Sequence, residues 1–307
     1  MSSRIDLLVE IATLYYEKGL TQTEIAKRKN LSRPTIAKLL QEAKDEGIVK
    51  ITIQYKDSNL IMLQENIKQK YDLKNCLIAS GKTEDTKAEV GKLCADFVEN
   101  RLDNIRYLGI GWGTTVYEYV NHASYHYFNN LTIIPLIGGF DFTEIKIHSN
   151  HLAFTLAQKY HCDVRYFYAP AITRTLEEKE LFIQSELVES ILNLGKNVDM
   201  AIVGVGNPIK SSTYRKLGYI KEEDAKELEK HHSVGDIGAT FFNEEGESIQ
   251  TNISNRMIGI TLHELKNVPE LVVLATGVEK KPSIKALLKQ NVIDHLIIDE
   301  ALASNLL

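Results

Sequence analysis

Apolar residues recur every three or four positions over most of the first 45 residues, the spacing of one buried helix face. Three helices are predicted there, one near residues 7–15, one from 21 to 29, and one that starts at Ser32 and is ended by Gly47. Between 47 and 53 the pattern changes to alternation of apolar and polar residues, which predicts a β-strand. Three helices followed by such a strand predict a winged helix-turn-helix.

Capping residues mark the ends of the second and third helices. Thr21 and Glu24 have the spacing of a capping box, in which each side chain bonds to the other residue's amide. Asn30 stands where a left-handed residue would end the second helix. Ser32 is the predicted N-cap of the third helix, and Pro34 lies in its first turn, where a missing N–H costs nothing.

The outer face of the third helix is polar, cationic and built of short side chains, which suits insertion into a DNA major groove. Such a face also occurs on ordinary helical hairpins. The small Ala26 at the helix crossing, Leu31 in the turn and the following strand favour DNA binding. We expect the contacts with double-stranded DNA to come from Thr21, Gln22, Arg33, Pro34, Thr35, Lys38, Gln41 and, on the wing, Lys50.

Beyond a polar turn near residue 57, short apolar strands alternate with helices, which predicts a doubly wound, parallel α/β sheet. A linker helix at about 59–71 comes first, and its apolar stripe could pack on this second domain or pair with its own copy in a dimer. Strands are predicted at 76–79, 107–110, 131–136, 164–168, 200–205, 256–260, 271–275 and 295–298. Helices are predicted at 85–101, 114–122, 149–160, 177–195, 221–230 and 281–290.

The charge of the 307-residue chain is unevenly distributed. The net charge is -5, but residues 1–56 hold 10 Lys and Arg against 7 Asp and Glu, whereas residues 57–307 hold 26 against 34. A basic first domain on an acidic second one fits phosphate-backbone binding confined to one end.

Targeting and metal signals are missing from the sequence. Asp6 and Glu10 interrupt the first apolar stretch, so it predicts a helix and not a signal peptide, and no apolar run reaches the ~18 residues of a membrane span. The cysteines Cys76, Cys94 and Cys162 are scattered, without CxxC or Cys/His ligand spacing. We therefore expect a cytoplasmic protein with reduced thiols, no metal site and no contact with membranes.

Glycine-rich loops follow several predicted strands, at the edge where doubly wound sheets bind ligands. The loop Gly111–Thr115 opens a helix, so its amides and two hydroxyls could hold a phosphate. It matches neither a P-loop nor a dinucleotide fingerprint, and a tight strand-helix turn is the alternative. Gly138 and Gly139 could admit a ligand or form a plain turn.

Three further positions are candidates on similar grounds. The loop 204–208 could admit a ligand or merely close a strand. Asp236, placed between two glycines, could accept two sugar hydroxyls, or it could be satisfied within its own turn. Lys280 follows a strand and precedes a helix, where it could meet a phosphate or remain solvated.

The ordered set of these segments resembles the SorC/DeoR-type family of bacterial sugar-responsive transcriptional regulators. In the first domain the resemblance rests on LYYEKGLTQTEIAKRKNLSRPTIAKLLQEAKDEGIVKI (14–51). In the second it rests on GIGWGTT (109–115), PLIGG (135–139), VGVGN (203–207), VGDIGATFFNEEG (234–246), NRMIGI (255–260) and ATGVEKKPSIKALLKQNVIDHLIIDEALASNLL (275–307).

The resemblance implies a winged helix-turn-helix over residues 1–56 and, over 57–307, an α/β effector domain of the sugar-phosphate isomerase (NagB/RpiA/CoA transferase-like) type. It implies a sensor without catalytic residues, cofactor or metal, whose allosteric effector is a phosphorylated sugar. It also implies a homo-dimer or tetramer on a roughly palindromic operator, mostly as a repressor of a carbohydrate-utilisation operon. The implied effector-binding residues are Gly111, Trp112, Gly113, Thr114, Thr115, Gly138, Gly139, Asp236 and Lys280.

Relatives that capture deoxyribose phosphate as a Schiff base carry a lysine where this chain has Ile137, so no imine is expected at that position. Two other functions stay open. One is a phosphosugar isomerase with an appended DNA-binding domain, for which Asp236 and Glu144 are the candidate bases. The other is an architectural DNA-binding protein with an inert second domain.

Overall fold

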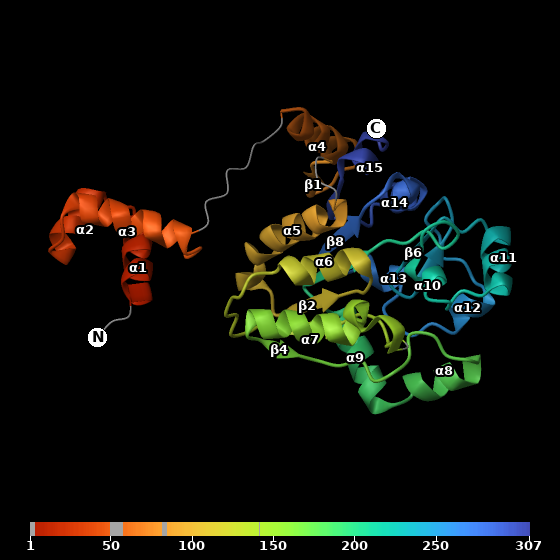
Figure 1. Cartoon of the computed structure of the whole chain (residues 1–307). Helices are drawn as coiled ribbons and strands as arrows, with labels where there is room; N and C mark the ends of the chain where they lie inside the picture. The colour runs from red at the N-terminus through yellow and green to blue at the C-terminus, as the bar shows by residue number, and fades with distance from the viewer. Residues whose placement is uncertain (1–3, 50–57, 82–84, 141) are drawn as a thin grey trace. The chain divides into compact units, whose positions relative to one another are not determined.

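The chain divides into two compact units, residues 1–56 and 57–307 (Figure 1). The computed structural model describes residues 4–49, 58–81, 85–140 and 142–307. Each unit is taken by itself below.

The first unit is a three-helix bundle. Helix α1 (Arg4–Ala12) continues into a π-helical turn (Thr13–Glu17), and α2 (Gln22–Lys29) and α3 (Arg33–Asp45) follow. Apolar side chains from all three helices form one buried cluster that includes Ile11, Ile25 and Ile36. The predicted helices are therefore confirmed.

The predicted helix ends are also confirmed. The Thr21 hydroxyl accepts a bond from the Glu24 amide, and the Glu24 carboxylate accepts one from the Thr21 amide. Asn30 is left-handed, with φ 54°, and the Ser32 side chain caps α3. The predicted wing lies, from Lys50 on, outside the described residues.

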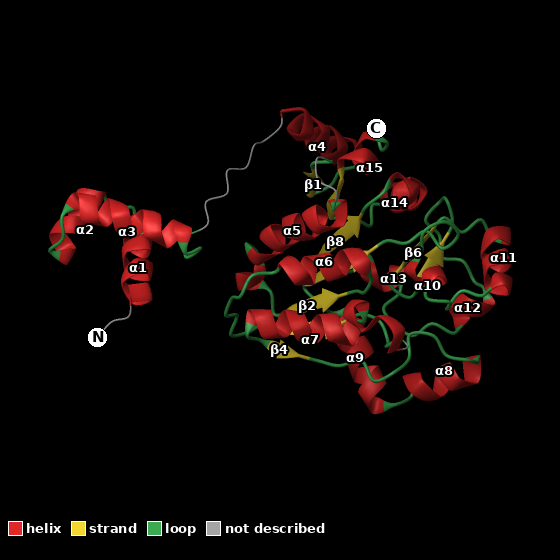
Figure 2. Cartoon of the chain, viewed as in Figure 1, coloured by secondary structure: helices red, strands yellow, loops and turns green. Residues whose placement is uncertain are grey.

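The second unit is built on a parallel sheet of seven strands in the order β1-β9-β8-β5-β2-β3-β4. Figure 2 shows the strands between layers of helices. A separate two-stranded hairpin is formed by β6 (Gly235–Ile237) and β7 (Thr240–Phe242). The strands of the main sheet are β1 (Asn75–Ala79), β2 (Tyr107–Ile110), β3 (Thr132–Pro135), β4 (Asp163–Val164), β5 (Met200–Gly204), β8 (Glu270–Ala275) and β9 (His295–Asp299).

Both faces of the sheet are buried, as the unbroken apolar runs of its strands require. In β5, for example, Met200 and Ile202 pack with α5, α6 and α7, whereas Ala201 and Val203 pack with helices on the opposite face. The first face carries α5 (Thr86–Glu99), α6 (Thr114–His122) and α7 (Ser149–Tyr160). The second carries α4 (Ser58–Lys70), α9 (Glu186–Lys196), α13 (Leu262–Leu265), α14 (Lys281–Lys289) and α15 (Glu300–Ser304).

Shorter elements complete the unit. They are the α-helices α8 (Leu176–Ile183), α10 (Thr213–Lys216), α11 (Glu222–Lys230) and α12 (Asn252–Asn255), and the 3-10 turns Leu102–Asn104, Phe142–Ile147 and Val278–Lys280. Among the described residues, no helix has the length and apolar character to cross a bilayer. All three cysteines are free, as predicted.

The linker helix α4 packs on its own domain. Ile67 is fully buried in the main core, and Leu60, Leu63 and Tyr71 pack against the same cluster. The Tyr71 hydroxyl donates to the Leu306 carbonyl at 2.7 Å. The apolar stripe of α4 therefore packs on the second domain, which is one of the two arrangements that the sequence leaves open.

Four predicted elements were wrong in detail. Residues 256–260 do not form a strand, because they make only isolated bridges, Ile172 to Met257 and Ile137 to Gly259. The helix predicted at 177–195 is two helices, α8 and α9, with Ser185 between them. The strand predicted at 164–168 pairs only over Asp163–Val164. The region around Asp236, expected as a loop, forms the hairpin β6-β7.

Helices α5 and α6 touch at Gly91, and this contact yields a stability prediction. A Cβ at Gly91 would lie 2.7 Å from the Glu118 carbonyl oxygen, so Gly91→Ala must push the helices apart. The expected cost is about 1–3 kcal/mol of unfolding free energy. Denaturation followed by the fluorescence of Trp112, the one tryptophan, reports on this domain. Gly81→Ala is the control, because among the described residues its Cβ would meet only the Glu300 side chain, at 3.5 Å. Equal stability of the two variants would contradict the close contact of α5 with α6.

Candidate functional site: a polar cleft at the carboxyl edge of the sheet

A cleft lies beyond the carboxyl ends of β2, β5 and β8, which are neighbours in the sheet. This position is where doubly wound sheets bind ligands. The residues that line the cleft are Lys87, Trp112, Gly113, Thr114, Thr115, Gly204, Val205, Gly206, Ser211, Thr213, Lys216, Asp236, Thr276, Glu279 and Lys280.

Helix α6 begins at the cleft without a side-chain cap. Its N-cap is Gly113, with φ 103° and ψ 175°, a conformation that favours glycine, which has no side chain to bond the first amides. Thr114 and Thr115 follow as the first helical residues and line the cleft. The first turn of a helix carries amides without intrahelical partners and a partial positive charge, so this wall can hold an anion.

Asp236 on β6 is buried in the cleft with an oxygen left over. Its side chain is 7% exposed, and Oδ1 has no hydrogen-bond partner among the described residues. A Cβ at Gly206 would overlap the Asp236 carboxylate, so glycine is required there. Burial raises the pKa of Asp236 to about 6, although the charge of Lys280 opposes the rise. Such a carboxylate is suited to accept hydroxyl groups from a ligand.

Lys280 is the buried cation of the cleft. It is 8% exposed, and its Nζ donates to the Ser211 carbonyl at 3.2 Å. Burial lowers the pKa of Lys280, while the charges of Asp236 and Glu279 raise it. An oppositely charged pair therefore lies at the inner wall of the cleft.

The structure brings six of the nine predicted effector residues into this one cleft and leaves three glycines outside it. The Gly111 amide donates to the Ile202 carbonyl, within the sheet. The amides of Gly138 and Gly139 donate to Ile258 and Ala169, and Gly139 lines a separate hollow beside Phe140 and Pro170. Since these amides are already bonded, they do not converge on the cleft, and their predicted ligand contacts have no support from its geometry.

Several cleft residues were not predicted from the sequence. Lys87 comes from α5 and Lys216 from α10, and neither stands in a motif. The loop 204–208, for which the sequence allows a ligand contact, does line the cleft through Gly204 and Gly206. Trp112, which lines the cleft, stacks on Phe140 with ring centroids 3.8 Å apart and meets Tyr214 edge-on, so two rings hold its indole in place.

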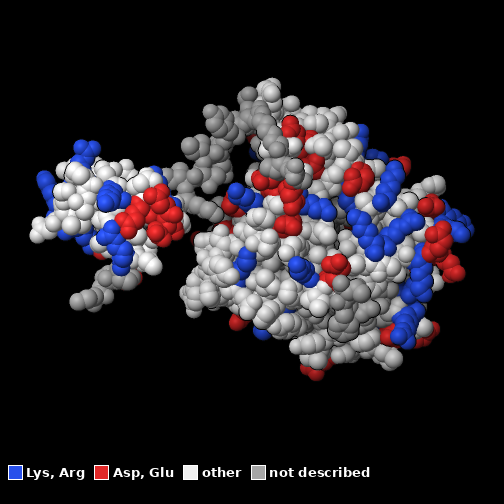
Figure 3. Space-filling model, in the orientation of Figure 1, with Lys and Arg blue, Asp and Glu red and all other residues white. Residues whose placement is uncertain are grey.

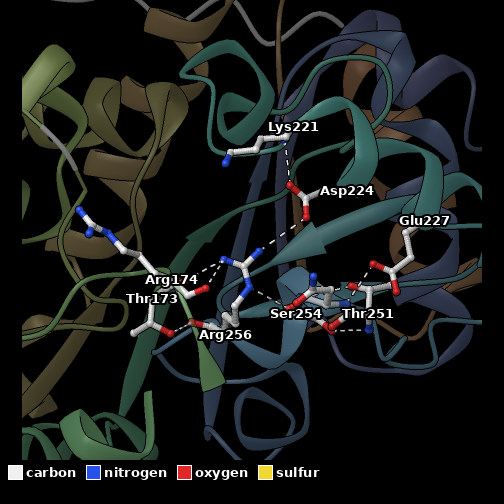
Figure 4. A network of polar contacts seen from close by, with 9 residues as sticks. Thr173, Arg174, Lys221, Asp224, Glu227, Thr251, Ser254 and Arg256 are labelled. Atoms are coloured by element: carbon white, nitrogen blue, oxygen red, sulfur yellow. Dashed lines mark hydrogen bonds and ion pairs between the residues drawn. The ribbon is translucent and has the colours of Figure 1, made fainter. Parts of the chain in front are cut away.

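A polar network holds the segment that carries α11 and α12 against the rest of the domain (Figure 4). Arg256 donates to the Thr173 carbonyl at 2.8 Å and lies 3.6 Å from the Asp224 carboxylate. Asp224 also accepts a bond from the Lys221 amide at the start of α11. Figure 4 shows Arg256 between these two groups, so the Arg256 side chain fastens α11 to the segment before α8.

The predicted DNA-reading face is open to solvent in the first unit. Thr21, Arg33, Pro34, Thr35, Lys38 and Gln41 are exposed, whereas Gln22 is half-buried. The Gln41 amide donates to Asp45 at 2.9 Å, one turn further along α3. Figure 3 shows Lys and Arg side chains over part of the visible surface of this unit.

The described residues form neither a metal-binding cluster nor an acid-base pair of Asp236 with Glu144. Over the described residues, no group of three or more His, Cys, Asp and Glu side chains could hold a metal ion. Glu144, the second candidate base, lies in the 3-10 turn Phe142–Ile147 and does not line the cleft. Glu144 therefore does not form an acid-base pair with Asp236 in the cleft.

Comparison with known proteins extends these observations to both units. The family model described as "Putative sugar-binding domain" matches residues 55–307, and the one described as "Winged helix-turn-helix DNA-binding" matches residues 11–50. The deoxyribonucleoside regulator of Bacillus subtilis is 28% identical over 297 residues, which are 96% of this chain and 95% of that protein.

Solved structures agree with this assignment. The full-length sorbitol operon regulator SorC from Klebsiella pneumoniae matches with a TM-score of 0.84 and 27% identity, over 100% of this chain and 99% of that one. A DeoR family transcriptional regulator from Listeria monocytogenes matches with a TM-score of 0.77 and 34% identity, over 81% of this chain and 100% of that one. The matches support a winged helix-turn-helix followed by a doubly wound α/β domain.

The buried carboxylate gives a stability prediction with a definite sign. Because the pKa of Asp236 is raised from 3.8 to about 6 on folding, its contribution to stability is present below pH 3.8 and is lost as the pH rises through 6. At pH 8, Asp236→Asn should therefore raise the unfolding free energy of the ligand-free protein, by an amount on the order of 1–3 kcal/mol.

Asp224→Asn is the matched control, because the Asp224 carboxylate is buried but bonded to Lys221 and close to Arg256. This control should lower the melting temperature. If Asp236→Asn destabilises the protein as much as the control, Asp236 is a satisfied structural residue.

Proposed function

The chain belongs to the SorC/DeoR-type family of sugar-binding transcriptional regulators, and we propose that it represses a carbohydrate-utilisation operon until a phosphorylated sugar binds the cleft. The observation that supports the proposal is that one cleft contains both a site suited to an anion and a site suited to hydroxyl groups. The uncapped start of α6 suits a phosphate, and the spare oxygen of Asp236 suits sugar hydroxyls. A sugar phosphate has both groups.

The exposed face of α3 supports binding to the major groove of operator DNA. Arg33, Thr35, Lys38 and Gln41 would read or anchor the duplex, and Lys50 on the wing would touch phosphate. We propose a homo-dimer or tetramer in the cytoplasm, whose two reading helices meet half-sites about one helical turn or a multiple of it apart. Effector binding then changes their spacing, with a coupling of about 1–3 kcal/mol.

The proposal assigns no catalytic role, cofactor or metal to the cleft. Relatives matched over nearly their whole length are named regulators, which favours regulation over an isomerase activity. The names of two relatives mention deoxyribonucleosides and a sorbitol operon, which keeps the expected effector among sugars and related compounds.

The DNA-reading role of α3 predicts a loss on mutation. Lys38→Ala should weaken binding to the DNA upstream of the protein's own gene or its neighbours by about tenfold or more at 150 mM salt. Fluorescence anisotropy with labelled fragments measures it. The control is Lys29→Ala, which removes the same charge from α2, where Lys29 pairs with Glu10 of α1. If Lys38→Ala and Lys29→Ala bind the DNA with equal affinity, α3 is not the DNA-reading helix that we propose.

The effector class is tested by thermal shift of the full chain against sugars and their phosphates. A matching sugar phosphate at 100 times its Kd should stabilise the domain by about 2.7 kcal/mol, or roughly 5–10 °C. The unphosphorylated parent sugar should shift the melting temperature far less. Equal shifts by both compounds would contradict the phosphate site, no shift by any would favour an inert domain, and steady conversion of the sugar phosphate would favour an isomerase.

A further inference from the structure

We propose that Lys87, in the first turn of α5, binds the phosphate of the effector together with the start of α6. The inference rests on the proposed function and adds to it a residue from another helix. It also fixes which end of the cleft takes the phosphate.

The side chain of Lys87 is already placed at that end. It lines the cleft, and its Nζ donates to the Thr114 hydroxyl at 3.1 Å. A phosphate held by the first turn of α6 would thus lie within reach of an ammonium group. Among the described residues, no carboxylate forms an ion pair with Lys87, so its charge is not neutralised within that part of the protein.

The cleft also offers hydrogen-bonding groups to a ligand independently of helix α6. Asp236 is more than nine-tenths buried, and within the described part of the chain its Oδ1 has no hydrogen-bond partner. The same holds there for the buried hydroxyl oxygen of Ser211, a residue of the same cleft. Unmet buried groups of this kind cost free energy, and a bound polyol would supply hydrogen bonds to them.

The charges around the cleft favour an anionic ligand. Lys87, Lys216 and Lys280 line it, against the carboxylates of Asp236 and Glu279. The positive charges of Lys87 and Lys216 are both felt at Lys280, where they add to the effect of burial in lowering its pKa. Figure 3 shows Lys and Arg side chains gathered over the region of α14 and β6. A phosphate would relieve this repulsion among the lysines.

These positions orient the ligand. The phosphate lies against the first turn of α6, where the Lys87 ammonium group can reach it, and the hydroxyls point towards Asp236 and Ser211. Since α5 and α6 abut at Gly91, the phosphate would join the first turns of two helices that already touch. Charged hydrogen bonds from a lysine are stronger than neutral ones, so Lys87 should account for a large part of the preference for phosphorylated ligands.

The test uses the full chain and two probes, inorganic phosphate and the sugar phosphate found by the thermal-shift panel. Affinities are measured by calorimetry for wild type, Lys87→Gln, Lys87→Arg and Lys92→Gln. Lys92 is the control, because it is an exposed lysine on the same helix and does not line the cleft. We expect Lys87→Gln to weaken both probes at least about tenfold, Lys87→Arg to restore part of the loss, and Lys92→Gln to change neither. The unphosphorylated parent sugar should bind Lys87→Gln and wild type equally.

A purely structural role for Lys87 gives a different result. If it only holds the Thr114 hydroxyl, Lys87→Gln lowers the melting temperature of the ligand-free protein and leaves both affinities unchanged, which overturns the inference. If wild type binds the sugar phosphate and the affinities of Lys87→Gln and Lys92→Gln for it are equal, the inference about Lys87 is overturned. The proposed function is unaffected by that result. Failure of wild type to bind any sugar phosphate defeats the proposed function and the inference with it.

Discussion

Seven parallel strands end at one edge of a sheet whose two faces are both covered by helices, and this constraint determines the chemistry of the second domain. The polar groups that follow β2, β5 and β8 therefore line the space beyond those three strands. There, as far as the structure describes the chain, the start of α6 lacks a side-chain cap and one Asp236 oxygen has no hydrogen-bond partner. The fold thus concentrates unmet hydrogen-bonding capacity at one place.

Holding these groups in the absence of a ligand costs stability. The Asp236 carboxylate is buried tightly enough that only glycine fits at position 206, and the raised pKa of Asp236 records the unfavourable burial of its charge. Binding sites commonly retain such unfavourable groups because a ligand satisfies them. A ligand that brings hydroxyls to Asp236 and an anion to α6 would gain free energy from both. Under the proposed function, the part of that gain that differs between two conformations biases DNA binding.

Local signals in the sequence were sufficient for the first unit and for the layered architecture. The capping pair Thr21 and Glu24 and the left-handed Asn30 define helix ends through contacts within a few residues. The meeting of Thr114 and Lys280 followed from one rule about strand ends, whereas Asp236 reaches the same cleft from the hairpin β6-β7. Lys87 could not be found in this way, because a helix packed beside α6 brings it to the cleft and no motif contains it. Gly138 and Gly139 failed to reach the cleft because chain segments far away in sequence occupy their amides.

The central claim is that occupancy of this cleft changes operator affinity. It is tested most directly by titrating the full chain onto one operator fragment at fixed salt, with and without a saturating sugar phosphate. The account predicts a change in Kd of about 5–150-fold on adding the effector, and no change for Asp236→Ala, whose cleft lacks the hydroxyl acceptor. Equal Kd values with and without a sugar phosphate that demonstrably occupies the cleft would contradict it.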